Sequence, residues 1–215
     1  MKKSVLTLSF FSAVILAGCG DAKKPEDKAE VKKDTVATKT EEVSVYVPDS
    51  ATMAKAWMDF MTPGDKHAWL ATYDGKWNVE MNSWMSPDAP PVKTTQVAES
   101  KMILGGRYQQ TVFKGSFEGQ PFEGIETLGF DNGKKVFVST WFDNMGTGIS
   151  MMSGTMDDAT KTITFEGYGT DPVTGKDQKM RQVVKFPDAN TQTMEMFCEV
   201  GGKEQKNMEV KMTRK

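Results

Sequence analysis

The chain contains one histidine, His67, among its 215 residues, and this limits the chemistry that its polar side chains can carry. A Ser-His-Asp triad or a metal site built from several histidines needs partners, and the sequence assigns none to His67. A single histidine can still act as an axial ligand of haem. Because His67 lies beside Trp69 in a short predicted helical segment, we expect it to pack or to cap that segment, and we expect no cofactor.

Glu126 is the carboxylate whose position is most informative. It alternates in phase with Phe122, Leu128 and Phe130 along a predicted strand. Because successive side chains of a strand point to opposite faces, Glu126 is predicted to face the same interior as these apolar residues. A carboxylate in that position needs a partner or a raised pKa. Glu126 is therefore a candidate ligand-recognition residue, although a structural ion pair or a solvated face ranks above that role.

Four more residues complete this candidate ligand-binding group. Arg107 and Arg181 are basic side chains that could pair with Glu126 across the interior. Trp77 and Trp141 are large aromatics in predicted strands, where they would serve as ligand walls or as anchors of the core. The sequence has no nucleophile elbow, phosphate-binding loop or CxxC pair. It therefore predicts no catalytic residue, and an enzyme ranks behind a binding protein or a structural module.

Methionine is frequent, with 16 residues in the chain. The soft thioethers of Met145, Met151, Met152 and Met156 could in principle bind Cu(I). However, Met151 and Met152 are neighbours in a predicted strand and point to opposite faces, so they cannot share a site. We expect no metal, and we interpret the methionines as adaptable filler of the interior.

An alternation with a period of two residues runs from Gly75 to the C-terminus and predicts the strands that position these side chains. It is clearest in segments 179–186, 193–199 and 207–212, where apolar and charged residues alternate. One apolar and one charged face indicate an antiparallel sheet with one wet face. About ten such strands would close on themselves and remove exposed edges. The predicted fold is all-β, an antiparallel meander β-barrel of about ten strands. Trp84 falls out of phase at the end of the first strand, which indicates either a bulge near Asn82-Ser83 or a strand with no solvent-exposed face.

A short helical cap is predicted to precede the strands. Asp49 or Ser50 is expected to cap a helix from Ala51 to Met61, in which apolar residues recur at helical spacing. Pro63-Gly64 interrupts it, and residues 65–73 are predicted to form a second short helical segment. We expect both segments to cover one end of the barrel.

The N-terminus has the features of an exported protein. Lys2 and Lys3 precede an apolar segment, residues 5–16, that is typical of a signal peptide and falls short of the roughly 20 residues of a spanning helix. The stretch Leu16-Ala17-Gly18-Cys19 resembles the bacterial lipoprotein lipobox, which implies cleavage before Cys19 and its acylation. The alternative is an ordinary secretory cleavage with an incidental cysteine.

Acyl chains on Cys19 would attach the protein to a membrane of the bacterial cell envelope. The next residue is Gly20 rather than the Asp that retains some lipoproteins at the inner membrane, so the outer membrane is favoured. Residues 1–18 are thus the predicted signal peptide, residues 19–47 a charged, disordered tether and residues 48–215 the domain. The formal net charge is −2 and there is no basic stripe, which argues against nucleic acid as a partner.

Several short motifs occur in order between residues 63 and 214 and together carry a family resemblance. They are His67-Ala68-Trp69-Leu70, Gly75-Lys76-Trp77, Leu104-Gly105-Gly106-Arg107, Pro121-Phe122-Glu123-Gly124, Leu128-Gly129-Phe130-Asp131, Thr140-Trp141-Phe142-Asp143 and Gly154-Thr155-Met156-Asp157. This set resembles the bacterial domain of unknown function, family 1579. The family is similar to lipocalin-like (calycin-type) barrels, which implies that Arg214 packs across Trp77 and closes the barrel, a cation–π contact of ~0.5–2 kcal/mol.

These expectations describe a membrane-anchored barrel that binds a small, largely apolar ligand without catalysis. The alternative is a structural or protein-interaction module of the envelope. The two hypotheses make different predictions for the interior of the barrel. A barrel of about this strand number is either filled by side chains, as in a structural module, or holds one ligand.

Overall fold

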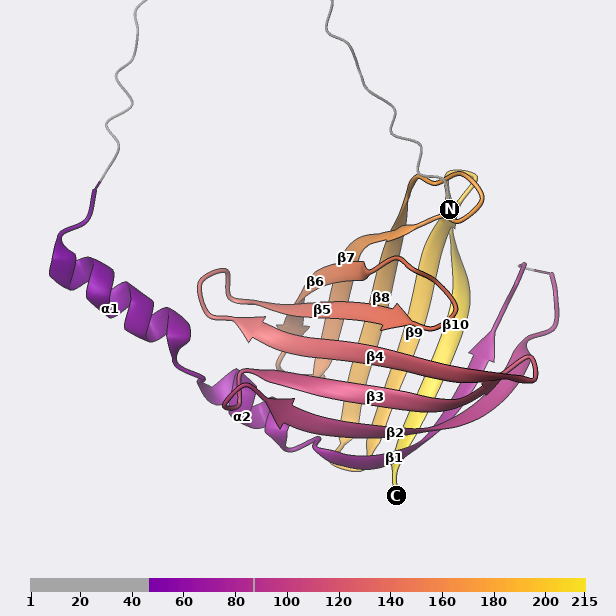
Figure 1. Cartoon of the computed structure of the whole chain (residues 1–215), viewed down its shortest axis with the longest axis horizontal. Coiled ribbons are helices and arrows are strands. Elements are labelled where there is room, and N and C mark those ends of the chain that lie inside the picture. Colours follow the sequence, from indigo (N-terminus) through magenta and orange to yellow (C-terminus); the bar gives the residue numbers. More distant parts are fainter. Residues whose placement is uncertain (1–46, 87) are drawn as a thin grey trace, which may run out of the picture. The chain divides into compact units, whose positions relative to one another are not determined.

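In a computed structural model, residues 47–86 and 88–215 are described (Figure 1). The predicted signal peptide, Cys19 and all but the last residue of the predicted tether lie outside this part of the chain. Two helices come first, α1 (Ser50–Met61) and α2 (Asp65–Ala71). The strands that follow are β1 (Gly75–Ser83), β2 (Val92–Ile103), β3 (Tyr108–Phe117), β4 (Gln120–Asp131), β5 (Val136–Asp143), β6 (Ser150–Asp157), β7 (Thr162–Thr170), β8 (Asp177–Asp188), β9 (Thr191–Val200) and β10 (Lys203–Arg214).

The ten strands form one closed antiparallel barrel. Each strand pairs with the strands next to it in sequence, and β1 pairs with β10. This closing pair aligns Trp77 with Arg214 at one end and Ser83 with Met208 at the other. Closure gives the first and last strands a partner on both sides, so neither presents an open edge. The predicted all-β meander barrel of about ten strands is confirmed.

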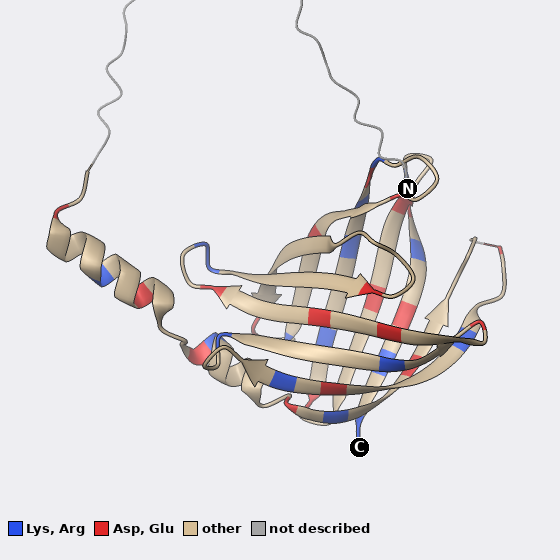
Figure 2. Ribbon diagram, in the orientation of Figure 1, with Lys and Arg blue, Asp and Glu red and all other residues tan. Residues whose placement is uncertain are grey.

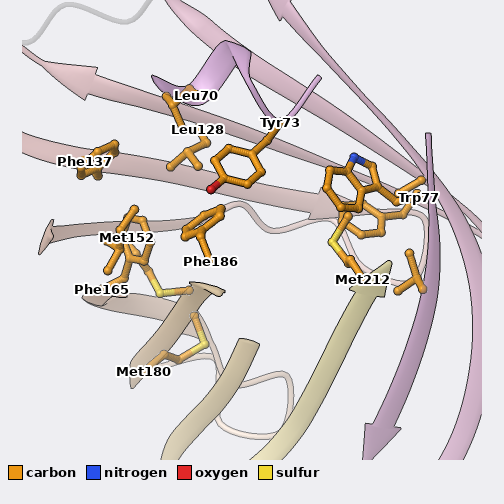
Figure 3. Packing of buried hydrophobic residues seen from close by; sticks show 14 of the residues in the cluster. Leu70, Tyr73, Trp77, Leu128, Phe137, Met152, Phe165, Met180, Phe186 and Met212 are labelled. Atoms are coloured by element: carbon orange, nitrogen blue, oxygen red, sulfur yellow. The ribbon is translucent and has the colours of Figure 1, made fainter. Parts of the chain in front are cut away.

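Alternating burial along each strand explains why this sequence closes into a barrel. In β8, Met180, Gln182 and Phe186 are buried, whereas Lys179 and Lys185, each directly before a buried residue, are exposed. The buried sides of the strands meet inside, and Figure 3 shows Phe186, Phe165 and Met152 pointing toward the same interior. Apolar area removed from water stabilises a fold by ~25 cal/mol per Å².

The two helices differ in how they meet the barrel. Asp49 caps α1, because its carboxylate accepts a hydrogen bond from the backbone nitrogen of Thr52 at 2.9 Å. All of α1 is exposed, whereas α2 buries His67 and Leu70 at one end of the barrel. α2 thus covers one end of the barrel as predicted. α1 is exposed along its length, and its C-terminal end is held by hydrogen bonds from Arg107 to the carbonyl oxygen of Met61 and from Asn132 to that of Asp59. Within the described residues, neither helix is long and apolar enough to cross a bilayer.

β1 shows no bulge near Asn82-Ser83, because it pairs in continuous register with both β2 and β10 up to Ser83. β1 ends at Ser83, before Trp84. In β10 the pairing with β9 shifts between Lys206 and Met208, so Asn207 is the extra residue. The backbone nitrogen of Trp84 then donates to the carbonyl oxygen of Asn207 at 2.9 Å. The predicted bulge near Asn82-Ser83 is therefore wrong. Trp84 is out of phase because it follows the end of β1, and the bulge at Asn207 belongs to the pairing of β10 with β9.

The outer surface of the barrel is charged with both signs. Figure 2 shows acidic and basic positions interspersed along the strands. One ordered example is Arg181 in β8, whose guanidinium makes two hydrogen bonds of 2.7 Å to the carboxylate of Glu204 in β10.

Candidate functional site

A cavity of about 320 Å³ lies inside the barrel. The side from β2 to β5 is called the polar wall because it carries both carboxylates of the lining, together with Phe113, Phe117, Phe122, Leu128 and Trp141. The side from β8 to β10 is called the apolar wall, and its polar residues are Gln182, Gln192 and Thr193. The polar wall contains Gln96, Gln109, Thr111, Glu126 and Ser139, and the apolar wall contains Val184, Met194, Met196, Met208, Val210 and Met212. The two carboxylates and the methionines Met194, Met196, Met208 and Met212 thus lie on different walls of the cavity.

Glu126 lies on the polar wall, as its phase in β4 predicted. In the register of the sheet it stands opposite Thr111 of β3 and Trp141 of β5. Ser139 Oγ donates a hydrogen bond to Glu126 Oε1 at 3.1 Å. The accessible part of the side chain faces the cavity that it lines. Burial raises the pKa of the Glu126 carboxyl, and the Ser139 hydrogen bond only partly opposes this.

Thr111 brings a hydroxyl group to the polar wall beside Glu126, and Ser100 contacts it from behind the cavity lining. Ser100 of β2 and Thr111 of β3 are both buried, and their oxygens are 2.9 Å apart. Neutral hydroxyls can hydrogen-bond a carboxyl in either protonation state because they both donate and accept. The wall next to Glu126 therefore supplies hydrogen bonds without supplying a positive charge.

Trp141 forms the cavity wall next to Glu126, toward the end of β5. Its Nε1 donates to Asp143 Oδ2 at 2.7 Å, and its ring stacks with Phe122 at a centroid distance of 6.3 Å. The indole also lies directly over Gly124, where a Cβ atom would be 2.6 Å from the ring. Trp141 therefore lines the cavity in a fixed orientation.

Two amide side chains on the cavity wall carry unsatisfied atoms. Gln96 Nε2 and Gln182 Oε1 are buried and have no hydrogen-bond partner within the described part of the chain. Each such atom costs ~1–3 kcal/mol, which hydrogen bonding to a bound molecule would offset. Neither glutamine was singled out from the sequence, although both occur at interior phase in their strands.

The predicted pairing of Glu126 with an arginine is not formed. Arg181 lies on the outer face, in the ion pair with Glu204. Arg107 lies in the β2–β3 turn, where its guanidinium donates to the carbonyl oxygens of Met61 at 2.7 Å and Leu104 at 3.1 Å. Of the five predicted ligand-binding residues, the structure brings Glu126 and Trp141 together at the cavity. The partner that sequence reasoning missed is Ser139, a small residue in a strand of continuous apolar character.

Trp77 and Arg214 meet at the end of the barrel that α2 covers. Trp77 is fully buried, and the guanidinium carbon of Arg214 lies 4.6 Å from its ring centroid, the contact that the family resemblance implied. Arg214 also donates to the carbonyl oxygens of Asp74 at 2.7 Å and of Thr72 and Ala189 at 2.9 Å each. Trp77 does not line the cavity, so we assign Trp77 and Arg214 a structural role in closing this end of the barrel.

His67 has a structural task in α2. Its Nδ1 accepts a hydrogen bond from the backbone nitrogen of Gly64 at 3.0 Å, and its ring packs edge-on against Phe130. Burial lowers the pKa of His67, which keeps the ring neutral and able to accept this bond. The described residues that line the cavity include no histidine, and His67 caps its helix.

Comparison with known proteins supports the fold and places the chain in a family. No curated protein matches the sequence at a significant level. Among solved structures, the chain is similar to that titled "Crystal Structure of Rv2717c from M. tuberculosis", with 14% identity, a TM-score of 0.53, and coverage of 72% of this chain and 99% of that one. At this identity the likeness concerns the fold alone. The model of the family "Protein of unknown function (DUF1579)" matches residues 62–214. The chain therefore belongs to the DUF1579 family of proteins of unknown function.

Proposed function

We propose that the barrel binds one small, largely apolar molecule in its interior cavity. The observation that carries this proposal is the cavity itself, about 320 Å³ between an apolar methionine-rich wall and a polar wall centred on Glu126. Small-molecule sites are concave, mostly apolar and carry a few placed polar groups, with volumes of roughly 300–1,000 Å³. A cavity at the lower end of that range suits one small molecule.

The same observation weighs against the filled-barrel alternative. Protein interiors are close-packed, and voids larger than a water molecule are few. A barrel that served only as a structural or interaction module would gain stability by filling this space, since unfilled volume costs ~24 cal/mol per Å³ in measured cases. A cavity lined by flexible methionines, which adapt to varied apolar shapes, supports a binding role instead.

A cavity-blocking substitution tests the proposal. Val210 lines the cavity, and the next residue of β10, Lys211, is exposed on the outer face. We expect Val210→Trp to weaken binding of a neutral, environment-sensitive fluorescent dye by about tenfold or more, whereas Lys211→Trp binds it as the wild type does. Equal affinity in both variants, with circular dichroism confirming that both are folded, would contradict binding inside the barrel.

Membrane attachment through acylated Cys19 is the second part of the proposal. It is supported by the signal-peptide pattern and the lipobox-like Leu16-Ala17-Gly18-Cys19 stretch. The barrel would then work at the surface of a bacterial envelope membrane, with the outer membrane favoured by Gly20. Mass spectrometry of the mature N-terminus is the test: we expect cleavage before Cys19 and added acyl mass on that residue, and a free Cys19 thiol would refute the anchor.

A further inference from the structure

The charged groups that line the cavity are all of one sign. Glu126 and Asp143 are its only ionisable lining residues, and no Lys, Arg or His side chain from the described residues reaches its surface. An anionic head group, such as a fatty-acid carboxylate, would enter without a counter-charge and would face a carboxylate across a low-dielectric interior. The lining therefore disfavours anionic amphiphiles.

The two carboxylates differ in how far their hydrogen-bonding capacity is used. Asp143 accepts from Trp141 Nε1 at 2.7 Å through Oδ2 and from the backbone nitrogen of Met145 at 2.9 Å through Oδ1. Glu126 accepts from Ser139 at Oε1, and its Oε2 has no hydrogen-bond partner within the described residues. Glu126 is therefore the acceptor that remains available to a molecule inside the barrel.

We propose that the cavity selects an apolar molecule that carries a protonated amine, with the ammonium group on Glu126 and the hydrocarbon part against the methionine wall. This inference rests on the proposed function and names its ligand class. A carboxylate accepting from an ammonium forms a charge-assisted hydrogen bond, which is stronger than a neutral one. Ser139 and the hydroxyl of Thr111 would complete the hydrogen bonding of the head group.

The opposite wall suits the rest of such a molecule. Met194, Met196, Met208 and Met212 line it from β9 and β10. Methionine is unbranched and polarisable, so these side chains can follow a flexible aliphatic chain without a fixed shape requirement. Charge at one wall and adaptable apolar surface at the other match an amphiphile with one cationic end.

Binding of a cation by Glu126 is linked to pH. The groups that face Glu126 from the neighbouring strands, Thr111 on β3 and Ser139 and Trp141 on β5, are uncharged, and Asp143 is the other titratable group of the lining. Because burial raises the pKa of Glu126, the empty site holds a proton over a wider pH range than an exposed glutamate. An amine with a pKa of about 10 would displace that proton, so affinity should increase as the pH rises through the titration of Glu126.

A matched ligand series tests this inference. Decylamine, decan-1-ol and decanoic acid share one chain and differ in head-group charge, and each competes against the neutral fluorescent dye at pH 8. In the wild type we expect the amine to bind about tenfold or more tighter than the alcohol, and the acid to bind weakest. Glu126→Gln should remove the preference for the amine and keep binding of the alcohol. Glu123→Gln, on the exposed outer face of the same strand, should behave as the wild type.

The outcomes separate this inference from the proposed function. Equal displacement by all three compounds, or an amine preference that survives Glu126→Gln, overturns the ligand class and leaves the binding cavity in place. Failure of the dye itself to bind overturns both. Calorimetry of the wild type with decylamine, in two buffers of different ionisation enthalpy, gives a readout that needs no variant. We expect proton release on binding near the titration of Glu126, and a proton count of zero across the whole pH range would contradict the assignment.

Discussion

Glu126 lines the cavity and also makes the stability of the protein depend on pH. Its carboxyl binds a proton more tightly in the folded barrel than in the unfolded chain, because burial raises its folded-state pKa above the ordinary value of 4.5. The folded state then holds more protons than the unfolded state between these two pKa values. The stabilising contribution of this group is fully present below the unfolded pKa and is lost as the pH rises through the folded pKa.

Replacing this carboxyl by an amide should reveal the linkage. We expect Glu126→Gln to gain free energy of unfolding relative to the wild type as the pH rises above 4.5, since the amide has no charge to desolvate. Urea unfolding at a series of pH values from 4.5 to 8 measures the difference. Glu123→Gln on the outer face is the control, and a Glu126→Gln difference that stays constant with pH would show that Glu126 is not held in the interior.

Sequence phase predicted where single residues face, but it did not predict their partners. Glu126 was placed inside because it alternates with Phe122 and Leu128. The same logic places Arg181 outside, between the interior residues Met180 and Gln182, so its pairing with Glu126 conflicted with the phase of its own strand. Arg107 lies in a turn, where alternation no longer applies. Partners depend on register between strands, which a single strand's pattern does not contain.

At the scale of elements, α2 is fixed into one end of the barrel by polar contacts as well as by Leu70. Gln109 Nε2 of β3 donates to the carbonyl oxygen of Leu70 at 2.8 Å and to Asp74 Oδ1 at 2.9 Å. Asp74 Oδ2 accepts from the backbone nitrogen of Met102 at 2.9 Å. Arg214 adds its bonds to Thr72 and Asp74, so the last residues of β10 hold the helix that precedes β1.

This arrangement predicts that the guanidinium shape of Arg214 matters more than its charge. Arg214→Lys keeps the charge but cannot span the carbonyl oxygens of Thr72, Asp74 and Ala189 together. We expect a loss of about 1–3 kcal/mol in free energy of unfolding, measured with urea. Arg181→Lys, in the partly exposed pair with Glu204, is the control and should lose less than about 1 kcal/mol. Similar losses for the two variants would argue against a special role of Arg214 in closure.

The sequence predicted the elements well where one rule governs a whole segment. Period-two alternation predicted an antiparallel barrel of about ten strands, and the ring contains ten. The position of α1 was not predicted, because amphipathic spacing indicates an apolar face without indicating what covers it. Trp57 and Met58 on this helix are exposed. The bulge at Asn207 was likewise missed, since it is a property of two strands in register.

At the scale of the whole molecule, the cavity is a direct consequence of the closure of the barrel. Ten strands paired in a ring enclose more space than their inward side chains fill, and the remainder is the cavity of about 320 Å³. The polar wall comes from the first half of the ring and the apolar wall from the second. The mixed charges of the outer surface leave the interior as the distinctive chemical feature of the barrel (Figure 2).

The most direct test of binding inside this cavity uses the methionines as reporters. Methyl NMR of ¹³C-methionine-labelled protein, titrated with neutral decan-1-ol, compares cavity residues Met194, Met196 and Met212 with the exposed Met85 and Met151. We predict saturable shifts at a one-to-one ratio for the cavity methyls, with the exposed methyls unchanged. Shifts confined to exposed methyls, with the cavity methyls silent at saturating alcohol, would contradict the account.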